Sequence, residues 1–182
     1  MSERQTVIRS MHDLGLAAWF GGSLFGAVGL NGASAAVSNP LDRTKVASAG
    51  WGRWAPVNAA AIGIHAVGGA ALIAGNAGRV AAQKGTRGNT VVKAGLTLLA
   101  MGVSAYSGAQ GARLGKESPT PAASGVDPSP GTSEEAAKAQ KQLKLLQWSI
   151  PALTGILLVM GVQQGEDQKA SQVAKGLFSL TK

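Results

Sequence analysis

His65 is the residue of this sequence that stands out for chemistry, because it lies in a long apolar stretch without any charged residue. An ionisable side chain at membrane depth is a candidate functional group by default, since transferring its charge into hydrocarbon is costly. Asn58 lies seven residues earlier on the same helical face, and Asn76 lies near the end of the stretch. His65 is therefore either a functional group or a neutral imidazole hydrogen-bonded to a neighbouring helix backbone or to Asn58.

The sequence offers too few ligands for a haem or a metal ion. It contains two histidines, His12 and His65, and no cysteine. A haem with two axial ligands needs side chains that face each other, whereas we expect His12 at the membrane edge and His65 near the middle of its helix. Two histidines without carboxylates in the same stretches are also too few for the usual metal sites. We therefore expect no cofactor, no metal and no enzymatic activity.

The basic character of the chain has a membrane explanation. The formal net charge is +8 and the isoelectric point is about 10.2. The lysines and arginines border the apolar stretches, where they anchor helix ends and attract anionic phospholipids. We therefore expect anionic phospholipids as partners and no nucleic acid.

Four charge-free stretches are long enough to cross a membrane, at 14–41, 55–78, 94–112 and 145–165. A helix needs about 20 apolar residues to cross about 30 Å of hydrocarbon. Every face of these stretches carries glycine, alanine or a larger aliphatic residue, whereas a helix of a soluble bundle has a polar outer face. The sequence predicts an all-α polytopic protein, a single membrane domain over residues 1–182. Its four helices, near 14–38, 55–79, 92–113 and 134–165, form an antiparallel bundle.

The segments outside these helices differ in composition. Residues 118–131 contain four prolines, which favour an extended, solvated linker. Thr132 and Glu135 have the spacing of a capping box, which predicts that a helix begins there and continues into the fourth apolar stretch. Residues 168–182 have the apolar stripe of a short amphipathic helix that lies on the membrane surface or against a partner, and the alternative is a frayed, solvated tail.

The second connection, residues 79–93, indicates the orientation. It carries Arg79, Lys84, Arg87 and Lys93 and no acidic residue. Short basic loops are retained in the cytoplasm. We therefore expect both termini and this connection in the cytoplasm, with the chain crossing the membrane four times.

Small residues recur at helical spacing within the apolar stretches. Glycine and alanine permit close backbone approach, which drives helix association in lipid. In the first stretch they predict a groove for a neighbouring helix, either inside the bundle against the second stretch or at a partner protein. The packing candidates are Gly22, Gly26, Gly29 and Ala33 in the first stretch, and Ala71 and Gly75 in the second.

The four-helix layout, the proline-rich third connection and the start HDLGLAAWFGGSLFGAVGLNGASAA resemble small actinobacterial membrane proteins. The whole chain is similar to the respiratory supercomplex association factors, four-helix accessory subunits of mycobacterial cytochrome bc–cytochrome aa3 supercomplexes. This resemblance implies a non-catalytic subunit of the plasma membrane. The segment LGLAAWFGG also looks like the opening of four-span families related to copper-resistance membrane proteins, although the ligands that copper requires are missing.

We therefore expect a non-catalytic accessory or assembly subunit of a larger membrane complex. The resemblance implies that its partners are subunits of cytochrome bc and cytochrome oxidase in a respiratory supercomplex. The alternative is a small transporter, or a lipid-binding or ligand-binding membrane protein, that acts as a homo-oligomer.

Overall fold

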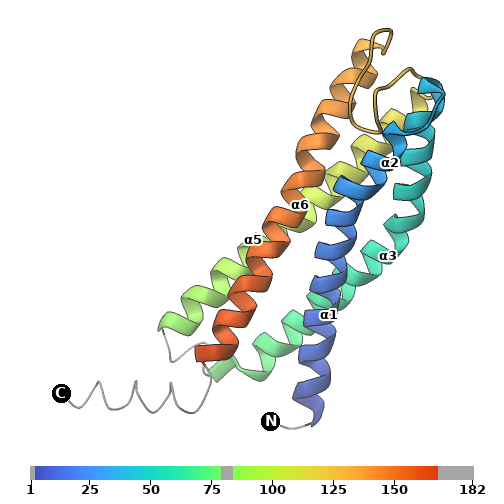
Figure 1. Cartoon of the computed structure of the whole chain (residues 1–182). Helices are drawn as coiled ribbons and strands as arrows, with labels where there is room; N and C mark the ends of the chain where they lie inside the picture. The colour runs from blue at the N-terminus through green and yellow to red at the C-terminus, as the bar shows by residue number, and fades with distance from the viewer. Residues whose placement is uncertain (1–2, 79–83, 168–182) are drawn as a thin grey trace.

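The computed structural model describes residues 3–78 and 84–167, and these residues form long helices joined by short connections (Figure 1). The first helix is continuous through three segments, α1 (Glu3–Phe25), the wider π-turn η1 (Gly26–Leu30) and α2 (Asn31–Ala35). It is followed by α3 (Pro40–Gly75), α5 (Lys84–Lys116) and α6 (Glu134–Asp167). All four long helices are apolar enough to cross a membrane. The predicted fold class, an all-α protein with four transmembrane helices, is confirmed.

The helices are longer than the charge-free stretches. The first begins at Glu3 and ends at Ala35, and α3 begins at Pro40, fifteen residues before the expected start at 55. The N-terminus of α3 is capped by Asn39, whose side chain accepts a hydrogen bond from the Leu41 backbone N–H. Charged residues at the helix ends therefore belong to the helices. The expected amphipathic helix at 168–182 and the connection at 79–83 lie outside the described residues.

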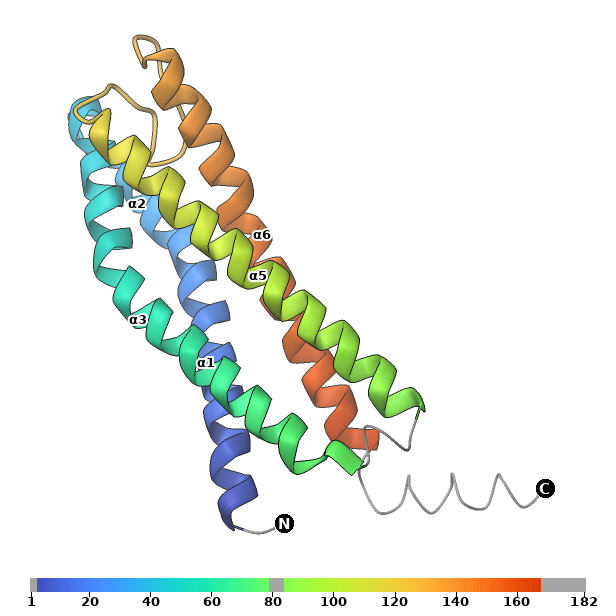
Figure 2. The same cartoon turned by 180° about the vertical axis from the view of Figure 1, so that it is seen from behind.

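The helices pair across the bundle. The first helix packs mainly on α3 and also contacts α6, while α5 packs mainly on α6 (Figures 1 and 2). The connection between α5 and α6 closes one end of the bundle, here named the capped end. The N-terminus lies at the opposite end, here named the open end.

The direction of α3 changes about half-way along its length, so that its second half crosses the first helix (Figures 1 and 2). Pro56 lies within this helix. Proline has no backbone N–H and its ring presses on the preceding turn, which bends a helix. The bend therefore has a sequence cause, and it sets where the second half of α3 meets α1.

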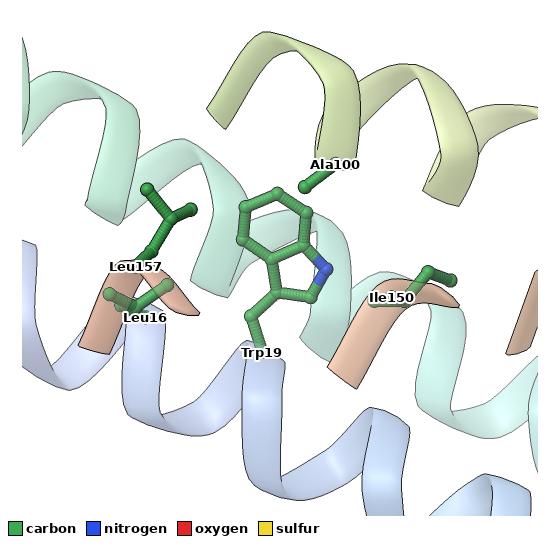
Figure 3. Packing of buried hydrophobic residues seen from close by; sticks show 5 residues of the cluster. All are labelled: Leu16, Trp19, Ala100, Ile150 and Leu157. Carbon is green, nitrogen blue, oxygen red and sulfur yellow. The ribbon is translucent and has the colours of Figure 1, made fainter. Parts of the chain in front are cut away.

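Trp19 of α1 fills the centre of the bundle. Its side chain is 0% exposed and lies among Leu16 of the same helix, Ala100 of α5, and Ile150 and Leu157 of α6 (Figure 3). The indole N–H donates a 3.1 Å hydrogen bond to the Ser104 hydroxyl on α5. One aromatic side chain thus ties three helices together, instead of marking the membrane surface as tryptophan often does.

The glycines of the first helix receive indole rings from α3. A Cβ atom on Gly22 would overlap the ring of Trp54, and one on Gly26 would overlap the ring of Trp51. The groove predicted for the first stretch is therefore filled inside the bundle. The residues that fill it come from the first half of α3, and not from Ala71 and Gly75 as we had expected.

The connection at 118–131 is not a solvated linker. Thr120, Ala122, Ser124 and Val126 are buried, and Ala122 forms an isolated antiparallel bridge with Pro128. Leu114, Ala136, Ala139 and Leu143 pack around Val126 in a second apolar cluster. The prolines prevent a helix, as predicted, but the alanines and Val126 between them have apolar surface to bury against the helix ends.

Hydrogen bonds to backbone groups hold this connection in place. The Arg43 guanidinium donates to the carbonyls of Ala122 and Ala123, and the Gly125 N–H donates to the Ser34 hydroxyl at 2.7 Å. Gln140 donates from α6 to the Ser124 carbonyl. Polar side chains thus form hydrogen bonds with the N–H and C=O groups of the irregular backbone that closes the bundle.

The start of α6 differs by one residue from the predicted capping box. The Ser133 hydroxyl accepts a hydrogen bond from the Ala136 N–H and caps the helix. The Thr132 hydroxyl instead donates to the Pro121 carbonyl and accepts from the Ser129 N–H. The expected capping by Thr132 is therefore wrong, because the folded connection uses its hydroxyl, while α6 does run without interruption to Asp167.

Substitution of Gly26 by leucine should destabilise the bundle, because the new side chain needs the space of the Trp51 indole. We expect a loss of about 1 to 3 kcal/mol, the usual cost of overpacking. Thermal unfolding of the detergent-solubilised protein measures it. Gly21→Leu is the matched control, since a Cβ atom at Gly21 meets nothing within 4 Å. Equal melting temperatures for the two variants would contradict the internal packing of this groove.

Acid should weaken the capped end through Asp127. Lys144 Nζ donates to Asp127 at 2.7 Å, and this hydrogen bond, with a second from Ser124, holds the pKa of the Asp127 carboxyl below its usual range. The ionised carboxylate therefore stabilises the folded state above its unfolded pKa of about 4, and the contribution disappears as the pH falls through the lower folded pKa.

The corresponding test is Asp127→Asn. Because the two side chains are 53% and 42% exposed, we expect a loss of less than about 1 kcal/mol at neutral pH and a smaller one near pH 3. Thermal unfolding at both pH values measures it, with the exposed Glu117→Gln as control. A deficit that stays constant with pH would show that the charge of Asp127 contributes nothing.

Candidate functional site

His12 of α1 and His65 of α3 form a stacked pair near the open end. The centroids of the two rings are 4.0 Å apart and the ring planes differ by 19°. His12 Nδ1 lies 3.0 Å from the His65 carbonyl oxygen, and His65 Nδ1 lies 2.9 Å from the His12 carbonyl oxygen. His65 is 2% exposed, and Trp19 lies against its edge at 6.2 Å between centroids. Each histidine thus binds the backbone of the other.

Two glycines allow this reciprocal contact. A Cβ atom on Gly15 would lie 2.6 Å from the Ala61 carbonyl oxygen and 2.7 Å from the His65 backbone nitrogen. A Cβ atom on Gly68 would lie 2.7 Å from the His12 backbone nitrogen. The backbones of α1 and α3 therefore touch on both sides of the histidine pair, as small residues permit in membrane helices.

The stacking of the two histidines contradicts the different membrane depths that we expected for them. We had placed His12 at the membrane edge and His65 mid-span, and their stacking puts them at one level. The expectation was wrong because it centred the second helix on its charge-free stretch, whereas α3 starts at Pro40 and crosses α1 obliquely. Of the roles considered for His65, the structure shows the hydrogen bond to a neighbouring helix backbone.

The hydrogen bonds also determine which nitrogen of each imidazole ring carries the proton. A carbonyl oxygen only accepts, so both Nδ1 atoms carry the proton, and in a neutral ring each Nε2 has a free lone pair. The rings stack face to face, which is not how two ligands hold a metal between them. Across residues 3–78 and 84–167, no group of three or more histidine, aspartate and glutamate side chains gathers in a metal-binding arrangement.

A cavity of about 400 Å³ opens beside the histidine pair, between all four helices. Its polar part includes Asp13 and Lys93, and its apolar part includes Leu16 and Leu157 from the core. Asn76 also lines it, just after α3, where its side chain donates to the Leu72 carbonyl at 2.8 Å and helps to end the helix. The remaining lining residues are Arg9, His12, His65, Ala66, Gly69, Leu72, Ile73, Thr90, Ala94, Thr97, Leu98, Met101, Gly161 and Gln164.

Lys93 is half-buried in the wall of this cavity. Its Nζ donates to the Gln164 side-chain oxygen on α6 at 3.0 Å. Lys144, in contrast, forms an ion pair with Asp127 at the capped end. Among the described side chains, Lys93 therefore has a neutral hydrogen-bond partner and no carboxylate within 4.0 Å.

The remaining residues predicted from the sequence lie apart from the cavity or only border it. Gly22 and Gly26 pack against indole rings inside the bundle, whereas Gly29 lies against the exposed Phe25 ring of its own helix. Ala33 and Gly75 are exposed, and Ala71 is half-buried. The Asn58 side-chain oxygen is buried and has no hydrogen bond, so Asn58 does not bind His65.

A second polar cluster, at the capped end, escaped the sequence analysis. The Asn31 side chain donates to Gln147 of α6 at 2.7 Å and accepts from the Trp51 indole N–H of α3 at 3.1 Å. Nothing in the sequence pairs residues 116 positions apart. The available signal was that an asparagine within an apolar helix must find a partner.

Comparison with known proteins identified no relative of this chain. The chain matches no protein-family model, no curated protein and no solved structure.

Substitution of Gly68 by alanine should separate α1 from α3 at the histidine pair. The added methyl group would lie 2.7 Å from the His12 backbone nitrogen and 2.9 Å from its Cα, where neither atom can move alone. We expect a loss of about 1 to 3 kcal/mol in thermal unfolding. Gly63→Ala on the same helix is the control, because a Cβ atom there meets nothing within 4 Å.

Nitrogen NMR of the two imidazoles gives a second measurement. The wild-type protein should show both rings protonated at Nδ1, and Gly68→Ala should lose this uniform state. If Gly68→Ala matches Gly63→Ala in both stability and spectrum, the close approach of the two backbones is refuted.

Proposed function

We propose that this protein is a non-catalytic accessory or assembly subunit of a larger complex in the bacterial plasma membrane. The observation that carries the proposal is a smooth face on α5 that no other part of the described structure covers. The sequence resemblance supports a respiratory supercomplex as the complex, with cytochrome bc and cytochrome oxidase subunits as partners. The basic connection before α5 supports cytoplasmic termini.

The free face of α5 consists of small residues at a seven-residue repeat. Gly88, Gly95, Gly102 and Ala109 are all exposed and lie in one line along the helix. A Cβ atom on any of the three glycines would meet nothing within 4 Å. Ala100, which packs on Trp19, lies on the other side of the helix. This line of residues is named the α5 stripe below.

The α5 stripe has the properties of a helix-docking surface. A repeat of seven residues keeps a stripe facing a straight or gently supercoiled partner over several turns. Helices gain no hydrophobic free energy by associating in lipid, so their contacts depend on close packing, which glycine and alanine allow. Exposed Val91, Leu98 and Leu99 border the stripe and give it apolar edges. A transmembrane helix of another subunit fits this surface.

Leucine on the α5 stripe should disrupt docking while the bundle stays intact. We expect Gly95→Leu with Gly102→Leu to lose co-purification with large membrane subunits in mild detergent, because two leucines hold a neighbouring helix away. The melting temperature of the isolated protein should change little, since both positions face open space. Gly108→Leu is the matched control, a glycine of α5 that is equally open and lies off the stripe.

The measurement is a native gel of the solubilised membrane, followed by mass identification of the bands. Co-migration of the wild type and Gly108→Leu with large subunits, and its loss in the double variant, would support the proposal. Migration of the wild type as a monodisperse homo-oligomer alone would contradict it and favour the small transporter or ligand-binding protein.

A further inference from the structure

We infer that the cavity at the open end binds a single-chain amphiphile with an anionic head group, of the fatty-acid class. The inference is independent of docking through the α5 stripe. It stands on three observations: a half-buried lysine that contacts no carboxylate of the described side chains, an apolar cavity floor, and a volume suited to one chain.

The anionic head is indicated by the charges at the polar part of the cavity. The charged side chains of the described lining are Arg9, Lys93 and Asp13, and Lys93 lies on α5 opposite α6. Lys93 gives its hydrogen bond to the neutral Gln164. A cation at the membrane boundary is costly unless it is paired or hydrated. A carboxylate at Lys93 would supply the missing negative charge.

The cavity lies where such a head group resides. Lys144 and Gln164 are twenty residues apart on α6, a rise of about 30 Å, which matches the thickness of the hydrocarbon core. Lys144 pairs with Asp127 outside the membrane at the capped end. Gln164 and its partner Lys93 therefore mark the opposite membrane boundary, and a head group bound there remains close to water.

The chain of the amphiphile is indicated by the floor of the cavity. Leu157 lies seven residues before Gln164 on α6, about 10 Å deeper in the bundle. Leu157 and Leu16 belong to the buried core around Trp19, and both line the cavity. Leu98 and Met101 of α5 continue the apolar wall. A polar entrance and an apolar floor match a molecule with one charged end.

The volume favours one chain over two. About 400 Å³ lies near the lower end of the range for pockets that hold small ligands. A phospholipid with two acyl chains would have to leave one chain outside the cavity. The histidine pair also lines the cavity, and a neutral imidazole Nε2 can accept a hydrogen bond from a hydroxyl group.

The test uses the full-length protein in neutral detergent and brominated stearate as the probe. Bromine quenches indole fluorescence at short range, and Trp19 packs on Leu16 and Leu157, which line the cavity. We expect saturable quenching by the acid in the wild type. In Lys93→Gln the affinity should fall about tenfold or more, the effect of losing one charge-assisted hydrogen bond. The neutral methyl ester of the same probe should bind both proteins equally.

Three variants control this experiment. Lys138→Gln removes an exposed lysine of α6 at the capped end and should bind the acid like the wild type. Lys93→Arg keeps the charge and should retain binding, which keeps the test decisive if Lys93→Gln does not fold. Gly161→Leu should abolish binding of both acid and ester, because a Cβ atom there has only Lys93 Nζ near it, at 4.0 Å, and the new side chain enters the cavity.

The proposal is overturned if Lys93→Gln and the wild type bind the acid with equal affinity, or if quenching by the acid is not saturable. Native mass spectrometry of the protein in vesicles of phosphatidylglycerol distinguishes the two sources of an anionic acyl chain. Displacement of stearate by phosphatidylglycerol, dependent on Lys93, would overturn the single-chain assignment in favour of a phospholipid. Retention of stearate in those vesicles would support it.

Discussion

The close crossing of α1 and α3 is the contact on which the rest of the structure depends. Lipid offers helices no hydrophobic gain for association, so a bundle depends on dispersion contacts and internal hydrogen bonds. Gly15 and Gly68 let the two backbones touch, and the histidines on either side bind each other's carbonyls. This crossing also directs Trp19 of α1 towards α5 and α6, where it completes the core. The position of every other helix follows from these contacts.

The two ends of the bundle use polar residues in opposite ways. At the capped end the polar groups are directed inward, and Asn31 joins α2, α3 and α6 while Arg43 binds the carbonyls of the folded connection. A buried polar contact that is satisfied on every side fixes one register. At the open end Lys93 lines a cavity and donates, among the described side chains, to the neutral Gln164. The polar groups of the capped end therefore hold the helices together, whereas those of the open end line the cavity for which we propose a ligand.

The sequence predicted the fold class because charge-free length is a local property, whereas the site depends on contacts between distant residues. Composition and spacing were enough to infer the four helices and the absence of helix at 118–131. They also predicted that Gly22 and Gly26 of the first stretch allow close helix packing. The meeting of His12 with His65 could not, because it depends on the bend in α3 and on Gly15 and Gly68, whose roles emerge only when the crossing is known. The burial of the proline-rich connection was missed for the same reason, since composition does not show which surface lies beneath a loop.

The distribution of glycines separates stability from binding. On the first helix Gly15, Gly22 and Gly26 face α3 and meet its backbone or its indole rings, so a side chain there would disrupt the bundle. On α5 the glycines of the stripe face away from α6 and nothing occupies them. Glycine costs helix stability compared with alanine, by about 1 kcal/mol per residue, and a bundle gains nothing from three glycines that contact no neighbour. A helix of another subunit that packs on the α5 stripe, as proposed above, would offset that cost.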